Sequence, residues 1–243
     1  AARSYFQFDD TRRRATYLGA TGLFVAALLT KTVTATLPAA ILVIAWWRRG
    51  RLSWRDDVRP LLPWFALALA GGLLTVWVES ALIGAQGADF ARGILERCLL
   101  PGRVILFYFA KLLWPANLTF IYPRWTIDTH DPIAHLFPAA VIAGLGLLWR
   151  RRHRGRAPLA AALLYGGTLF PVLGFFNVYP FRYSFVADHF QYAACLAPLA
   201  ALGAAVAHLA PRLRRPAAVA FAAACAVLSW KQSAMYRDVF TLY

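Results

Sequence analysis

Apolar runs that approach the thickness of a bilayer recur along the chain and are separated by short polar segments. A helix that crosses a bilayer needs about 20 predominantly apolar residues. We therefore expect an all-α fold, a polytopic transmembrane helical bundle formed by a single membrane domain over residues 1–243. The runs predict about seven spans, over Ala15–Thr30, Leu37–Trp47, Pro60–Trp77, Ile133–Trp149, Pro158–Phe176, Gln191–Leu209 and Ala217–Trp230.

Lys31 lies between the first two apolar runs and is followed by threonines at positions 32, 34 and 36. Threonine hydroxyls can satisfy backbone carbonyls locally, so Val33–Trp47 is predicted to be helical with a kink at Pro38. The two spans then form a hairpin with Lys31 at its tip. A single lysine at this place either extends to the lipid head groups or binds a lipid phosphate or pyrophosphate.

Leu99–Pro115 is apolar enough to span, but it contains Arg103 and Lys111. These cations are eight residues apart, and therefore share one face of a helix. If the segment spans, one arginine cluster falls on the outer side of the membrane. We favour the alternative, an amphipathic helix in the outer interface whose cationic face meets the head groups.

The charge distribution separates the two sides of the membrane. Only 15% of the chain is charged, 60% is hydrophobic and the mean hydropathy is +0.53, whereas about a quarter of a soluble domain is charged. A net charge of +15 would suggest nucleic acid in a soluble protein. Here 16 of the 26 Lys and Arg residues form four short clusters between apolar runs, as in cytoplasmic loops, so no nucleic-acid partner is expected. The clusters lie within 12–14, 48–59, 150–156 and 212–215.

The segment Asn177–Tyr192 concentrates polar side chains between two apolar runs. Ionisable groups at membrane depth are costly and usually functional, so we predict a binding site here. The alternative is a polar loop whose aromatic rings belong to the interfacial belt. The polar and tyrosine side chains are Asn177, Tyr179, Arg182, Tyr183, Asp188, His189, Gln191 and Tyr192.

The three cysteines, Cys98, Cys195 and Cys225, have no metal-ligand or redox spacing, and no metal or cofactor is predicted. The chain starts with Ala-Ala-Arg rather than Met. We expect it to be a piece of a longer protein, cut at both ends.

Three motifs in this order resemble a known family: Thr30–Pro38 (TKTVTATLP), Lys111–Leu118 (KLLWPANL) and Asn177–Tyr192. They are similar to bacterial membrane proteins that carry C-terminal tetratricopeptide repeats, and to the transmembrane and tetratricopeptide-repeat O-mannosyltransferases of the GT-C glycosyltransferase fold. The end of the chain, 236–243, looks like the lead-in to such repeats. The resemblance implies a multi-pass protein of the bacterial inner membrane.

This resemblance also implies a donor substrate, a polyprenyl-phosphate-linked sugar that enters from the outer leaflet as a membrane lipid. Arg182 and Lys31 are the expected phosphate ligands, with His189 third, because a departing phosphate needs cations. His189 departs from the family pattern, where arginine is found. Asp188 is expected to orient Arg182 or His189, or to contact the sugar, and Tyr183 and Tyr192 to stack on the sugar or the isoprenoid.

The resemblance places the catalytic acid of the GT-C fold in an upstream loop, so the catalytic residue is unknown here and catalysis by this chain alone is not expected. The acceptor would be a protein, or neighbouring subunits would complete the assembly. A non-catalytic membrane anchor or assembly subunit is the alternative function. A transporter is disfavoured, because the chain shows no repeated halves.

Overall fold

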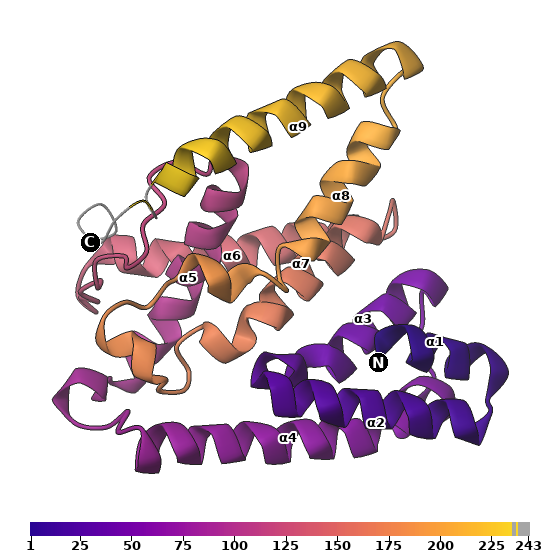
Figure 1. The fold of residues 1–243 in the computed structure, drawn as a ribbon, viewed down its shortest axis with the longest axis horizontal. Coiled ribbons are helices and arrows are strands. Elements are labelled where there is room, and N and C mark those ends of the chain that lie inside the picture. The colour runs from indigo at the N-terminus through magenta and orange to yellow at the C-terminus, as the bar shows by residue number, and fades with distance from the viewer. Residues whose placement is uncertain (235–236, 238–243) are drawn as a thin grey trace.

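The structure is a computed structural model that describes residues 1–234 and residue 237, and all regular structure in that part is helical (Figure 1). The predicted helical class is confirmed. The proposed lead-in to repeats, 236–243, lies outside the described residues except for Arg237. The α-helices are α1 (Ala2–Thr11), α2 (Arg14–Thr30), α3 (Leu37–Arg49), α4 (Leu62–Trp77), α5 (Ile94–Leu113), α6 (Pro132–Arg151), α7 (Ala157–Leu169), α8 (Leu196–Ala207) and α9 (Pro211–Ser233).

Three helical segments are long and apolar enough to cross a membrane, namely Trp54–Leu82, Pro132–Arg151 and Pro211–Ser233. The structure therefore indicates a membrane protein, but it does not support seven spans. The helices α3 and α7 have only 13 residues each and α8 has 12, which at 1.5 Å per residue is about 20 Å, less than the hydrocarbon thickness of about 30 Å. A short 3₁₀ turn at Phe170–Val172 ends α7 inside the predicted span Pro158–Phe176.

A first apolar core joins α1, α2 and α4. The indole ring of Trp64 stacks on Phe24, with ring centroids 4.5 Å apart and planes 5° apart, and Tyr5 meets the same indole edge-on. Trp64 Nε1 donates a hydrogen bond to Thr21 Oγ1 at 2.9 Å. The buried indole therefore has its one polar atom satisfied, which removes the cost of an unpaired donor.

The break at Lys31 is confirmed, but the kink at Pro38 is not. Thr32–Thr36 forms the 3₁₀ turn, and α3 starts at Leu37 with Pro38 in its first turn. A proline at this place loses no helical hydrogen bond, because the first N–H groups of a helix have no partner inside it. The helix α3 packs mainly against α7, and α2 against α1 and α4, so α2 and α3 are not a closely packed hairpin.

A second and larger core is organised by α5, which packs most extensively on α6. Gly102 of α5 lies against the backbone of Phe137 and Pro138. The helix is not among the candidate spans, which agrees with the predicted non-spanning segment. The two cations of the predicted amphipathic face contact protein atoms rather than forming a free polar face: Arg103 lies 4.3 Å from the ring centre of Trp125, and Lys111 binds backbone carbonyls.

Candidate functional site

Buried aromatic residues hold the polar segment Asn177–Tyr192 in place. Phe181, Phe185 and Val186 belong to the second core. Ser184 Oγ donates to the carbonyl of Val186 at 2.9 Å and accepts from its N–H at 3.2 Å, which closes a tight turn between two short 3₁₀ helices, Tyr179–Arg182 and Asp188–Gln191. The polar side chains of the segment therefore project from a backbone with fixed anchors.

Asp188 starts the second of these 3₁₀ helices, and its carboxylate accepts a hydrogen bond from the hydroxyl of Tyr122 at 2.8 Å. The adjacent peptide is clamped by Tyr108, whose hydroxyl accepts from the N–H of Ala187 at 2.8 Å and donates to its carbonyl at 3.1 Å. Burial raises the pKa of Asp188, and this effect exceeds the opposing effects of the Tyr122 hydrogen bond and of the Lys111 and His189 charges.

Lys111 supplies a fixed cation next to this carboxylate. Its ammonium donates to the carbonyls of Ala116 and Asn117, at 2.6 and 3.0 Å, and lies 5.5 Å from the ring centre of Tyr122. The sequence indicated Lys111 as part of an amphipathic face and of the Lys111–Leu118 motif, but not as a site residue. The structure places it in the group that contains Asp188.

The charge of Lys31 acts on His189, although the two residues are far apart in the sequence. Burial lowers the pKa of His189, and the charge of Lys31 lowers it further, while Asp188 acts in the opposite direction. Lys31 is exposed at the C-terminal end of α2, where a cation is favoured by the helix dipole. Because the neutral imidazole is favoured, His189 is a weaker phosphate ligand than Lys31.

Arg182 belongs to a different part of the same face. The Nε of Arg182 lies 3.3 Å from a carboxylate oxygen of Asp89. Arg124 also binds Asp89: it forms an ion pair with the carboxylate and donates a hydrogen bond to the backbone carbonyl. Thus Asp89 orients Arg182, whereas Asp188 is bonded to Tyr122. Tyr183 pairs edge-on with Tyr179 beside Arg182, with ring centroids 6.1 Å apart.

Tyr192 is exposed, with 69% of its surface accessible. Among the described residues its ring pairs with no other aromatic ring. Its carbonyl accepts a hydrogen bond from Cys195 Sγ at 3.1 Å. The structure therefore places Tyr192 at the surface without a rigid partner, free to contact an apolar ligand.

Arg92 and Arg97 are candidate ligands that the sequence did not single out. Both donate to Asn177 Oδ1, at 2.9 and 3.1 Å. Arg92 lies over the rings of Phe181 and Phe185, 5.3 and 5.1 Å from their centres. Burial lowers the pKa of Arg92 to about 10, with further lowering by the neighbouring charges of Arg97 and Arg124.

Two guanidinium nitrogens of Arg92, Nε and Nη1, are buried and have no hydrogen-bond partner within residues 1–234 and 237. Buried donors without partners are costly, so they indicate a place where an anion or water would be stabilised. One signal in the sequence was available: Arg92, Arg97, Arg124 and Arg182 all lie outside the four arginine clusters that were predicted to be cytoplasmic, so the positive-inside rule does not account for them.

An apolar groove of about 520 Å³ runs between α5, α6, α7 and α8. Ile105, Phe109 and Leu112 of α5 line it, so the groove uses the same helix that carries Lys111. Small residues such as Ala161, Ala162 and Gly166 leave the space open. The helix α5 therefore contributes to the apolar groove and, through Lys111, to the group that contains Asp188.

Within the part of the chain that the structure describes, no three His, Cys, Asp or Glu side chains gather as metal ligands. Comparisons of the chain with protein-family models, with curated proteins and with solved structures found no match.

Proposed function

We propose that the chain is the C-terminal part of the membrane module of a glycosyltransferase that uses a polyprenyl-phosphate-linked sugar, and that it binds this lipid-linked donor at the outer face of the bacterial inner membrane. The observation that carries the proposal is that α5 contributes both to the apolar groove and, through Lys111, to the group that contains Asp188. A lipid-linked phosphate needs both features together, a channel for the isoprenoid and cations for the phosphate.

In this proposal Lys31 and Arg182 bind the phosphate from the two sides of the polar segment. Arg182 suits a phosphate because its planar fork forms paired hydrogen bonds, and Asp89 holds that fork in position. Asp188, held by Tyr122, accepts hydrogen bonds from sugar hydroxyls. Tyr183 and Tyr192 contribute exposed rings for the sugar or the isoprenoid.

The proposal includes a multi-pass topology. The three long apolar segments would cross the membrane together with the shorter apolar helices Arg14–Thr30, Ala157–Val172 and Leu196–Ala207 and with α3. The four arginine clusters would then share the cytoplasmic side.

Native mass spectrometry of the detergent-purified chain titrated with a polyprenyl phosphate tests the proposal. We expect a one-to-one complex that Lys31→Gln and Arg182→Gln both weaken roughly tenfold, since a hydrogen bond to a charged group contributes about 1.5–3 kcal/mol. Arg3→Gln is the control, because Arg3 is exposed on α1 and forms no ion pair within the described residues. If Lys31→Gln, Arg182→Gln and Arg3→Gln all bind the polyprenyl phosphate with the same affinity, the proposed donor site is refuted.

A non-catalytic anchor or assembly subunit is the second candidate function. The helices α6 and α9 bury no residue inside the chain, although both are long and apolar. Faces of this kind contact lipid or neighbouring subunits. A stoichiometric protein partner in the same mass spectra, without bound polyprenyl lipid, would favour this function.

A further inference from the structure

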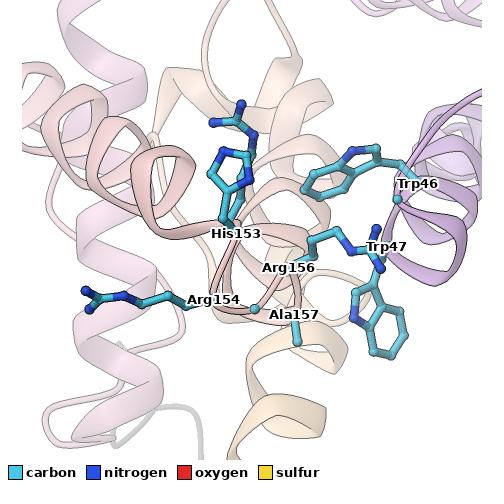
Figure 2. A pocket seen from close by; sticks show the side chains of 9 residues that line it. Trp46, Trp47, His153, Arg154, Arg156 and Ala157 are labelled. Atoms are coloured by element: carbon cyan, nitrogen blue, oxygen red, sulfur yellow. The ribbon is translucent and has the colours of Figure 1, made fainter.

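A second cavity, of about 540 Å³, lies where the C-terminal end of α3 meets the turn between α6 and α7. Its walls are Trp46, Trp47 and Gly50 on one side and Arg152–Ala157 on the other. Figure 2 shows the side chain of Arg156 extending toward Trp47, and Trp46 facing His153 across the space. Both of the arginine clusters that border the cavity are among those predicted to be cytoplasmic, so the predicted topology places the cavity on the side opposite to the proposed donor site.

Gly50 fixes the position of the Arg156 side chain. It ends α3 in the left-handed region, with φ 78° and ψ −7°, and its N–H donates to the carbonyl of Trp46 at 2.7 Å. A Cβ atom at this position would lie 2.8 Å from Arg156 Cζ and would overlap Nη1. The absence of a side chain therefore lets the guanidinium lie directly against the backbone.

The positive charge of the cavity is not compensated by the protein. Within residues 1–234 and 237, Arg152, Arg154 and Arg156 form no ion pair. The carboxylates of this side that do form ion pairs, Asp9 and Asp57, are bonded to Arg49, and Asp9 also to Arg12. The N-terminal end of α7 adds the positive end of a helix dipole to the same space.

The arginines of the turn are not equivalent. Arg152 donates to the carbonyl of Trp149 at 2.8 Å and stacks on its ring at 4.0 Å, so it is held by α6. Arg154 points away from Trp46 and Trp47 in Figure 2. Arg156 is therefore the guanidinium that faces the cavity with its donors available.

We propose that this cavity binds the phosphate of an anionic lipid head group, with Arg156 as the principal ligand. The planar guanidinium matches a phosphate oxygen pair, and basic pockets between membrane helices bind lipid head groups. The two tryptophans suit a lipid rather than a free phosphate, because indole rings favour the membrane interface, with an apolar body toward the acyl chains. The site does not depend on the proposed donor function.

Native mass spectrometry of the detergent-purified chain, titrated with dioleoyl phosphatidic acid, tests the site. We expect Arg156→Gln to weaken binding roughly tenfold, the effect of losing hydrogen bonds to a charged group. Arg154→Gln removes the same charge from the same turn and should change the affinity less than about twofold, because exposed charges are screened. Gly50→Ala keeps every charge and should also weaken binding, by displacing the guanidinium.

Equal weakening by Arg154→Gln and Arg156→Gln would overturn the proposal, since it would indicate attraction by the turn as a whole. Arg156→Lys separates charge from geometry: it should recover only part of the affinity if the planar fork binds the phosphate. Glycerol 3-phosphate is the soluble probe. If it binds as tightly as phosphatidic acid, the assignment to a lipid head group is refuted. The helical circular dichroism spectrum of each variant must match that of the parent chain.

Discussion

Replacing Gly102 with alanine introduces a methyl group into the contact between α5 and α6. The ideal Cβ position lies 2.6 Å from Pro138 Cα and 2.8 Å from the carbonyl carbon of Phe137. Carbon atoms in favourable contact are about 3.5–4.0 Å apart. Because the obstructing atoms belong to the backbone of α6, no change of side-chain rotamer relieves the overlap, and the two helices must separate by about 1 Å to restore that spacing.

The expected cost follows from two opposing contributions. Overpacking costs about 1–3 kcal/mol, and a backbone obstruction places Gly102→Ala near the upper end of that range. Alanine gains about 1 kcal/mol over glycine inside a helix. The net loss of stability is therefore about 2 kcal/mol, which corresponds to a Tm lower by about 4–8 °C for a chain of this length.

Thermal unfolding in detergent micelles, followed by tryptophan fluorescence, measures this change. Gly146→Ala on α6 is the matched control, because a Cβ there has no atom within 4 Å, and its Tm should be equal to or slightly above that of the parent. A Tm for Gly102→Ala that is unchanged or raised, with Gly146→Ala behaving as expected, would show that α5 and α6 are not this close.

Two further predictions concern the candidate functional site. Tyr122→Phe removes the hydrogen bond to Asp188 and should lower stability by about 1.5 kcal/mol, whereas Tyr192→Phe, at an exposed hydroxyl, should have little effect; equal Tm values in the same unfolding assay would refute the bond. Lys31→Gln should raise the pKa of His189, measured by an NMR titration of the labelled imidazole, and an unchanged pKa would contradict the proximity of the two residues. Because the folded chain lowers this pKa, stability should be complete above about pH 6.5 and fall as the pH drops below it, and Lys31→Gln should reduce that loss.

Part of the candidate site was accessible from the sequence. The segment Asn177–Tyr192 and the lysine at position 31 stand out locally, because they interrupt apolar runs. The hydrogen-bond partners of the site residues could not be predicted from the sequence. Tyr122 and Asp188 are 66 residues apart, and Arg92 and Asn177 are 85 apart, so only the packing of α5 against the rest of the second core brings them together.

The sequence by itself determined that the chain is helical and of membrane type, because both follow from the length and apolarity of contiguous segments. It also located the helix break at Lys31, since a charge and a run of threonines act on the nearest backbone. The tertiary structure decided how long each helix is, that α5 is a core element, and which cations have carboxylate partners. These properties depend on atoms that are distant in the sequence: Pro138 against Gly102, or Arg156 against Gly50. Close packing is a property of such pairs, and no local pattern specifies it.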